Sequence, residues 1–571
     1  MARRLNGGRK LLAAIGALLA ICGCGGPRTE VERIGEDYWQ ASLRRFPSSA
    51  TYKGDHRYDD RLEDLSQQAA IDWNNAQAGY LARLSSLDDA GLTEADRLNK
   101  AILQRQLTDA QEEFRCKNYL KPLSHQSGPH IGFPMLLVSH PFRTERDYRN
   151  YVARLDAFPA QVDQLIDCLD KGIAEGHVPP RIIVEKTIPQ MAVHIVARPE
   201  ESVFYAPVGK FPAGISQRKR ADLTEAIRTA IATRVVPAYR HLQHYVQGTY
   251  LPACRDTVGI WAEPDGDAIY DILARVHTTT DMTPEEIHEV GVKEIARIRG
   301  EMEKVKAEMG FAGPLDAFID HMRTDPSYRA ASAEALLAEF RATLDWARPR
   351  MTQLFGRLPK APVEIKEMEA FRAPAAPAAY AYPPPEDGSR PGYFYVNTYK
   401  AEERPTYTKE ALTFHEALPG HHFQMSLDIE NKHLPHFRRY SDFTAYIEGW
   451  GLYSESLGAE IGGYADPASR FGRLTFDAWR AARLVVDTGI HRKRWPREQS
   501  VAYMRQNTGL SEVDINSEID RYIAWTGQAL AYKIGELVIH RLRHEAELAL
   551  VDRFDVRAFD DTLLAEGAQP L

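Results

Sequence analysis

The segment that most constrains the fold of this chain is "LTFHEALPGHHFQM", residues 412–425. A His followed by Glu opens the metal site of many zinc hydrolases, in which a second His four residues later shares one helical face. Here that position is Pro419, and the next histidines are His421 and His422. On a regular helix, a residue six positions after His415 is rotated by about 600°, and one seven positions after it lies about 10.5 Å further along the axis. The helix must therefore be interrupted if two of these histidines bind one metal ion.

The residues between the histidines favour such an interruption. Pro419 has no N–H for the helical hydrogen bond, and Gly420 can adopt dihedral angles that other residues avoid. If two residues bulge out, His421 takes the place of the usual second ligand and His422 faces elsewhere, toward substrate. The alternative, in which His422 is the ligand, stays open.

A third ligand is expected downstream, in "FTAYIEGWGLYSESLGAE". Glu448 lies there among apolar residues in a helical pattern, and an unpaired buried carboxylate is costly unless it coordinates a metal. A salt-bridged helix carboxylate is the alternative reading. Glu455 follows two turns later on the same face, where it could orient a ligand.

These residues predict one catalytic Zn²⁺ held by His415, His421 and Glu448. Two imidazoles and one carboxylate leave the site positive, which lowers the pKa of bound water to about 7. Glu416, next to the first ligand, would then act as the general base. A structural zinc site usually has four protein ligands, and no fourth candidate is evident in the sequence.

The pair "HEALPGHHFQ" and "EGWGLYSE" resembles the motifs of a widespread, poorly characterised bacterial family, H-E-x-x-P-G-H-x-x-Q with a downstream E-G-W-A-L-Y. Further similar blocks are "FPSSATYKGDHRYDDRLEDLS", "EEIHEVG", "VNTY", "DTGIHRKRW" and "GQALAYKIG". That family is placed among the gluzincin metallopeptidases. The resemblance implies a mainly α, large two-lobed zincin-like fold, with a deep cleft and a small β-sheet beside the metal-binding helix. Such a fold is similar to that of carboxypeptidase Taq and of angiotensin-converting-enzyme relatives, and the implied metal ligands are again His415, His421 and Glu448.

The chain departs from the family pattern at two positions. Gly451 replaces the usual Ala after E-G-W, and Thr526 replaces the Pro before the "GQAxxYKxG" block. We expect neither residue to touch a proposed ligand or the base.

Peptide hydrolysis also needs a donor for the developing oxyanion. By resemblance to related peptidases Tyr532 is the first candidate, and His491, with Asp487 four residues earlier on the same helical face, is the second. Arg521 and Lys533 could hold the C-terminal carboxylate of a substrate, although an Arg on a helix is often a simple ion-pair partner. The full set of substrate-binding candidates is Asn397, His422, Arg521, Tyr522, Gln528 and Lys533.

The chain is predicted to be exported. "MARRLNGGRKLLAAIGALLAICGCGG" has a basic start and an apolar run from Leu11 to Ile21, which is shorter than the about 20 residues that span a bilayer. "ICGC" resembles a lipobox, so we predict a lipoprotein signal peptide over residues 1–23, lipidation at Cys24 and a tether over 24–35. The protein would then be held by its lipid at a membrane of the bacterial cell envelope, facing the periplasm. A plain signal peptide with an unmodified Cys24 is the alternative.

The rest of the chain reads as an ordinary globular protein of mainly helical pattern. It has 571 residues, 44% hydrophobic content and a net charge of −8, which gives no basic surface for nucleic acid. "TPEEIHEVGVKEIARIRGEMEKV" predicts a helix with a capping box, and residues 371–392 read as a loop or linker. "YFYVNTY" (393–399) predicts a strand, either an edge strand that pairs with substrate or an ordinary strand of a sheet. We expect a helical N-terminal region (36–360) and a zincin-like catalytic region (361–571) that form one cleft.

Three functions fit this sequence. The first is a zinc-dependent metallopeptidase that acts on peptides, as a carboxypeptidase or an oligopeptidase. The second is a non-catalytic envelope lipoprotein that keeps a zincin scaffold, which the intact Glu416 disfavours. The third is a metal hydrolase of another amide or ester, which would use the same residues.

Overall fold

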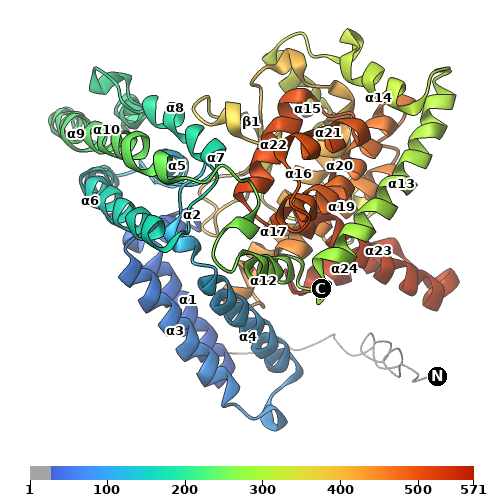
Figure 1. Cartoon of the computed structure of the whole chain (residues 1–571). Helices are drawn as coiled ribbons and strands as arrows, with labels where there is room; N and C mark the ends of the chain where they lie inside the picture. Colours follow the sequence, from blue (N-terminus) through green and yellow to red (C-terminus); the bar gives the residue numbers. More distant parts are fainter. Residues whose placement is uncertain (1–27) are drawn as a thin grey trace.

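The computed structural model describes residues 28–571, and the chain is mainly α-helical with one small sheet, as predicted (Figure 1). The predicted signal peptide and Cys24 lie outside the described residues. The first helix begins at Glu30, so residues 30–35 of the predicted tether are helical. The helices used below are α1 (Glu30–Arg45), α3 (Gln67–Ser85), α4 (Glu94–Arg115), α5 (Pro129–Ser139), α6 (Glu145–Glu175), α9 (Gln217–Ala230), α10 (Val236–Tyr245), α12 (Gly266–Thr278), α13 (Pro284–Glu308), α14 (Leu315–Thr324), α15 (Ala333–Ala347), α16 (Lys409–Glu416), α17 (His421–Glu430), α18 (His436–Arg439), α19 (Thr444–Glu460), α20 (Pro467–His491), α21 (Arg497–Asn507), α22 (Glu512–Ala524), α23 (Ala531–Leu550) and α24 (Val556–Ala565).

The helix α13 shows that local sequence signals set helix ends in this chain. Thr283 Oγ1 accepts a hydrogen bond from the Glu286 amide (3.2 Å), and Glu286 Oε2 accepts one from the Thr283 amide (2.8 Å). This is the predicted capping box, which satisfies amide groups that have no partner within the helix. The apolar face of α13 packs along α20 in the core.

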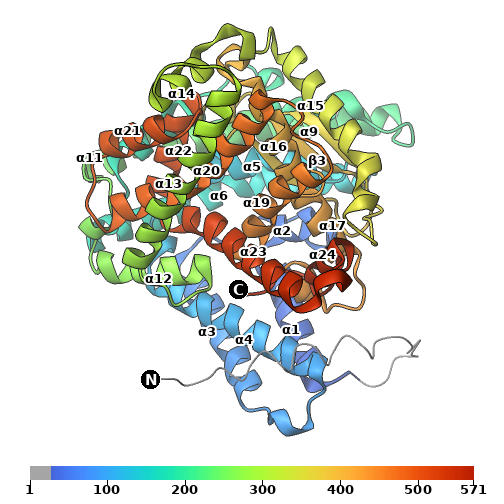
Figure 2. The ribbon, with the colours of Figure 1, turned by 90° about the vertical axis from the view of Figure 1, so that its right-hand side faces the viewer.

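The N-terminal lobe, α5 to α10, has its own hydrophobic core. Leu155, Val162 and Tyr239 are fully buried there, in a cluster that extends from Leu123 to Cys254. The helical arm formed by α1, α3 and α4 projects from the body of the molecule (Figures 1 and 2). Its core includes Phe437 on α18 and Tyr446 on α19, so the arm packs against the segments that follow the first metal motif.

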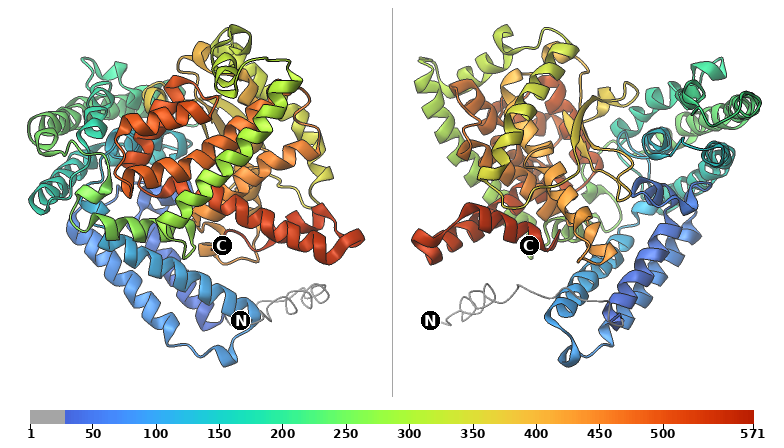
Figure 3. Two further views of the ribbon diagram at one scale, coloured as in Figure 1. Left: turned by 45° about the vertical axis from the view of Figure 1, so that its right-hand side comes forward. Right: turned by 180° about the vertical axis from the view of Figure 1, so that it is seen from behind.

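The C-terminal lobe, α13 to α24, surrounds the candidate site with a single large core. This core takes residues from α13, α14 and α15 as well as from α16, α17 and α19 to α22, so it continues across residue 360. Helix α20 is buried along almost its whole length and forms the centre of the lobe. Figure 3 shows the small sheet between this lobe and the N-terminal lobe.

The sheet has three strands in the order β1-β3-β2. They are β1 (Val363–Glu367), β2 (Ala379–Tyr382) and β3 (Gly392–Val396). The predicted strand is present as β3, but β3 is central, with parallel β1 on one side and antiparallel β2 on the other. The expectation that this strand forms the edge was wrong, because β2 lies inside residues 371–392, where prolines and alanines obscured the strand signal.

Cys116, Cys168 and Cys254 are free and buried. Between residues 28 and 571, no helix combines the length and the apolar composition needed to cross a bilayer.

Candidate metal centre and active site

The helix that carries the first motif breaks between its histidines. Helix α16 ends at Glu416, Ala417 has non-helical dihedral angles (φ −113°, ψ −89°), and α17 begins at His421. A Cβ at Gly420 would collide with the carbonyl oxygen of His415, so the chain can double back this tightly only with glycine there. The predicted two-residue bulge is therefore a complete break followed by a second helix.

This break brings three potential ligands together. One ligand atom from each of His415, His421 and Glu448 lies within 4.8 Å of the others. Glu448 Oε2 is 3.2 Å from His421 Nε2 and 3.5 Å from His415 Nε2, yet this buried oxygen accepts no well-aligned hydrogen bond. Converging lone pairs without hydrogen bonds suit a shared cation, and two imidazoles with one carboxylate are a donor set that fits Zn²⁺ with an open position. Figure 2 shows α16, α17 and α19, which supply these residues, side by side.

The neighbouring His422 points away from this cluster. Its Nε2 lies 3.0 Å from the carbonyl oxygen of Ala361, and burial lowers its pKa to about 4, against the effect of that hydrogen bond. It does not line the cavity at the metal cluster. The structure therefore corrects both roles considered for His422, as the second ligand and as a substrate-binding residue.

Behind the cluster, Glu455 holds the first imidazole. Its Oε1 is 2.9 Å from His415 Nδ1 and 3.0 Å from Arg480 Nη2. Together with Arg480 Nη2, 3.4 Å from the same Nδ1, this contact fixes the orientation of the His415 ring, with Nε2 turned toward Glu448. Burial alone would lower the pKa of His415, but the adjacent carboxylates of Glu448 and Glu455 raise it to about 9, so a metal bound at Nε2 would displace a proton.

Electrostatics also keep Glu448 ionised, which a metal ligand requires. Burial alone would raise the pKa of Glu448, but the adjacent His421 and His415 hold it well below its usual value. His421 differs from His415 in this respect: its Nδ1 has no hydrogen-bond partner within the described residues, so no carboxylate holds its ring as Glu455 holds that of His415.

Gly451 lies against the imidazole rings of two of the three candidate ligands. A Cβ at this position would be 2.8 Å from His415 Cε1 and 3.0 Å from His421 Cε1. The expectation that Gly451 touches no ligand was therefore wrong. The missing side chain lets α19 approach both imidazoles closely.

A cavity of about 260 Å³ opens beside the three ligand residues. Glu416 lines it, and its carboxylate forms no hydrogen bond or ion pair within residues 28–571. Residues 377–381, which include the start of β2, form part of the opposite lining. Because β2 pairs with β3 on one side only, its outer edge has backbone groups available to an extended chain.

Tyr532 also lines this cavity, and its ring stacks on His415 at a centroid distance of 6.2 Å. Its hydroxyl accepts hydrogen bonds from Arg521 Nη2 (2.8 Å) and Gln528 Nε2 (3.5 Å), which leaves its own proton available. Burial raises the pKa of Tyr532, although Arg521 opposes the shift, so the hydroxyl is protonated at neutral pH. Tyr532, Arg521 and Gln528, three of the residues named from the sequence, thus all line this cavity.

Two other candidates have structural roles. His491 accepts a hydrogen bond at Nδ1 from the Ile260 amide, and its Nε2 donates to the carbonyl of Tyr522 (both 3.0 Å). Both nitrogens are therefore occupied, and His491 has no donor for an oxyanion. Lys533 is fully buried in ion pairs with Asp477 and Glu536 and does not line the cavity, so it has no group for a substrate carboxylate.

Asn397 and Tyr522 lie behind the cavity lining. Asn397 Nδ2 donates to the carbonyls of Ala373, Ala376 and Pro377, and so fixes the loop that leads into β2. The hydroxyl of Tyr522 is held by neighbouring buried side chains. Both were predicted to bind substrate, and the structure places both outside the cavity.

The family described as "Bacterial protein of unknown function (DUF885)" matches residues 47–571. The chain belongs to this DUF885 family. None of the curated proteins in the comparison matches it.

Two solved structures resemble this DUF885 protein over nearly its full length. A protein of Colwellia psychrerythraea, described as a candidate lipoprotein, has 28% identity and a TM-score of 0.89, with 95% of this chain and 97% of the other covered. A candidate lipoprotein of unknown function from Shewanella oneidensis has 19% identity and a TM-score of 0.70, with 95% and 98% covered. The second likeness shows a shared fold only.

Sequence reasoning missed two arginines at the site of this DUF885 protein. Arg480 and Arg483 lie on α20, line the cavity and are almost fully buried. The signal was present in "FDAWRAARLVV", where three charged residues spaced three apart (Asp477, Arg480 and Arg483) interrupt an otherwise apolar helical segment. A buried Arg needs a partner, so such a pair marks either an ion-pair network or a site.

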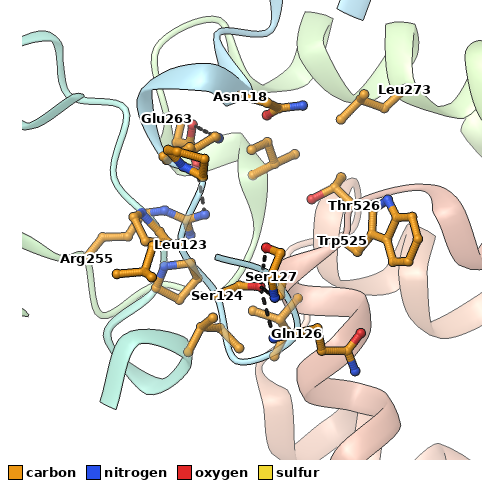
Figure 4. Close-up of a pocket in the computed structure, with 18 of the residues that line it drawn as sticks. Asn118, Leu123, Ser124, Gln126, Ser127, Arg255, Glu263, Leu273, Trp525 and Thr526 are labelled. Carbon is orange, nitrogen blue, oxygen red and sulfur yellow. Dashed lines mark hydrogen bonds and ion pairs between the residues drawn. The ribbon is translucent and has the colours of Figure 1, made fainter. Parts of the chain in front are cut away.

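A second cavity of about 490 Å³ adjoins the first (Figure 4). Gln126 and Trp525 line both cavities. The walls of the second cavity combine apolar residues such as Leu123 and Leu273 with polar and charged ones. They include Thr526, the second position where the chain departs from the family pattern. Gln126 comes from the N-terminal lobe and Trp525 from the end of α22, so both lobes contribute to this space.

Proposed function

We propose that this DUF885 protein is a zinc-dependent metallopeptidase of the gluzincin type. The observation that carries the proposal is the convergence of His415, His421 and Glu448 beside the unpaired carboxylate of Glu416. A structural metal site would close its fourth position with protein, whereas this cluster faces a cavity.

The chain's own residues suit hydrolysis of an amide bond. Zn²⁺ held there would polarise a substrate carbonyl and lower the pKa of a water molecule. Glu416, which has no competing partner, would take the proton of the attacking water and pass it to the leaving amine. Tyr532 would donate its free hydroxyl proton to the developing oxyanion, because its hydroxyl oxygen is already held by Arg521 and Gln528.

A peptide is the substrate that the surroundings favour. The outer edge of β2 borders the cavity and could pair with an extended backbone. The adjoining cavity of about 490 Å³ gives room for a substrate larger than a single amino-acid amide. An ester or another amide would use the same groups and is the alternative function.

We also infer that the protein is a lipoprotein of the cell envelope. The lipobox-like "ICGC" supports this, and so do the candidate lipoproteins among the similar structures. Labelling of cells with a radioactive fatty acid tests it. Label should be incorporated by the parent chain and lost in Cys24→Ala, whereas label retained by Cys24→Ala would contradict the assignment.

The peptidase proposal is tested with the purified protein and a mixed peptide library, with products identified by mass spectrometry. Glu416→Gln is expected to lower the rate by about 10²- to 10⁴-fold, the usual contribution of a general base, while zinc remains bound. Glu410→Gln, in the first turn of the same helix and outside the cavity, is the matched control and should retain activity. Zinc-loaded parent protein that cleaves no peptide, or equal cleavage by Glu416→Gln, would contradict the proposal.

A further inference from the structure

Two arginines in the cavity share a single counterion. Arg483 Nη2 lies 2.9 Å from Glu518 Oε2, and Arg521 Nη1 lies 3.5 Å from the same oxygen. Within the described residues, Glu518 is the one carboxylate within ion-pair distance of either guanidinium. Glu518 is ionised, because the two arginines lower its pKa against the effect of burial. The three groups together therefore carry one uncompensated positive charge.

This positive charge is buried and incompletely bonded. Arg483 is 1% exposed, and its Nη1 has no hydrogen-bond partner in the described part of the chain. An Arg with an unused donor in a buried setting is costly, and a carboxylate that accepts from two guanidinium groups would remove that cost. Both arginines line the metal-side cavity, so such an anion would come from a molecule bound there.

The other acidic groups near the cavity do not supply this anion. Glu448 lies against the two imidazoles, and Glu455 lies against His415 and Arg480. Glu416 lines the cavity too, and it forms no ion pair with any of the arginines. These three carboxylates therefore belong to the metal side of the cavity.

The arginines are separated from the metal cluster by the ring of one residue. The Tyr532 ring centroid lies 6.2 Å from that of His415 and 4.0 Å from the guanidinium carbon of Arg483. An extended chain advances about 3.3–3.6 Å per residue, so these two separations together correspond to no more than about three residues.

We propose that Arg483 and Arg521 bind the C-terminal carboxylate of a peptide substrate. The enzyme would then be an exopeptidase that removes no more than about three residues from the C-terminus. This inference rests on the proposed peptidase function and adds the substrate class. It replaces the pairing of Arg521 with Lys533, because Lys533 is already neutralised by two carboxylates.

Binding is measured first, on the zinc-loaded Glu416→Gln protein, so that the result does not depend on turnover. The probes are an N-acetylated alanine hexapeptide with a free C-terminus and its C-terminal amide, titrated by calorimetry. We expect the acid to bind at least about tenfold more tightly than the amide, because only the acid offers a charged acceptor to the two guanidinium groups. Adding Arg521→Gln should remove this difference, and Arg521→Lys should keep part of it.

Arg404→Gln is the matched control, because Arg404 is also buried and pairs with Asp514 on the same helix, α22. It should leave the preference for the acid unchanged. A third probe, an amidated hexapeptide with one glutamate side chain, separates the two sources of carboxylate. If it binds as tightly as the free acid, the arginines recognise an acidic side chain and the C-terminal assignment is overturned.

The cleavage products of the parent enzyme provide the second readout. Fragments of one to three C-terminal residues, released from the acid but not from the amide, are expected. Equal cleavage of acid and amide would overturn the carboxylate site while leaving the peptidase function intact. Absence of any cleavage, together with a retained preference for binding the acid, would instead count against the peptidase function alone.

Discussion

The metal cluster and the arginine pair lie in one cavity, but they are built in different ways. The candidate metal ligands His415, His421 and Glu448 come from one stretch of the chain, on α16, α17 and α19. Arg483 and Arg521 come from α20 and α22 and meet only through tertiary packing. Local geometry therefore determines the first group, whereas the position of one helix against another determines the second.

The largest effect should come from removing a ligand on the metal side. Loss of a residue that only hydrogen-bonds to a metal ligand typically weakens metal binding by about 10- to 100-fold. His421→Ala removes a proposed ligand itself, so we expect it to weaken zinc binding by more than this. Zinc content after dialysis against a chelator, measured by mass spectrometry, tests this. If His421→Ala kept its zinc, the local break would not define the site.

His422→Ala is the control for that experiment. It is the next residue on α17, and its ring bonds to Ala361 rather than facing the cluster. Its loss should lower thermal stability, because it leaves a buried void, but should not alter zinc affinity. The reverse pattern, zinc lost in His422→Ala and kept in His421→Ala, would assign the second ligand to His422.

The difference between the two groups explains what the sequence could predict. Pro419 and Gly420 indicated an interrupted helix, and the apolar neighbours of Glu448 indicated a buried carboxylate, so the three residues that converge could be named from their nearby sequence. Arg521 was named for substrate binding, but its partner was misjudged. From sequence alone, Lys533 and Arg483 both read as cations in helices, and only packing shows which one is neutralised.

A similar limit applied to the fold. The capping box of α13 and the strand β3 depend on neighbouring residues and were predicted correctly. The edge position of β2 depends on which strands pair, and its four residues, "AYAY", lie between prolines, so they read as a loop. His491 looked like a catalytic donor because its two hydrogen-bond partners, the Ile260 amide and the Tyr522 carbonyl, are distant in sequence.

A smaller effect should follow from breaking the contact that joins the two sides. Glu455 contacts both His415 and Arg480, and Arg480 lies on α20 with Arg483. Glu455→Gln keeps the size of the side chain but removes its charge. We expect zinc affinity to fall by about tenfold, the lower end of the range for residues that contact a metal ligand rather than the metal. Competition with a fluorescent zinc chelator measures this change.

The matched control for Glu455→Gln is Glu460→Gln, at the exposed end of the same helix, where Glu460 pairs with Arg543. It should leave zinc affinity unchanged. If Glu455→Gln also abolished the preference for a peptide with a free C-terminus, the metal and arginine sides would be coupled through Arg480. If only zinc affinity changed, the two sides would act independently.

The smallest effect is expected from Gly451→Ala, and it separates helix stability from site geometry. Ala is favoured over Gly within a helix by about 0.5–1 kcal/mol, so the substitution should stabilise α19 by itself. Its Cβ, however, would lie 2.8 Å from His415 Cε1, so an imidazole or the helix must shift. We therefore expect a several-fold loss of zinc affinity with little loss of thermal stability.

Gly300→Ala on α13, where a Cβ meets no atom within 4 Å, should raise stability and leave zinc binding unchanged. If Gly451→Ala bound zinc as tightly as the parent, α19 would have enough freedom to accept the Ala that the family motif carries at this position, and the close approach of α19 would not be needed to position the ligands.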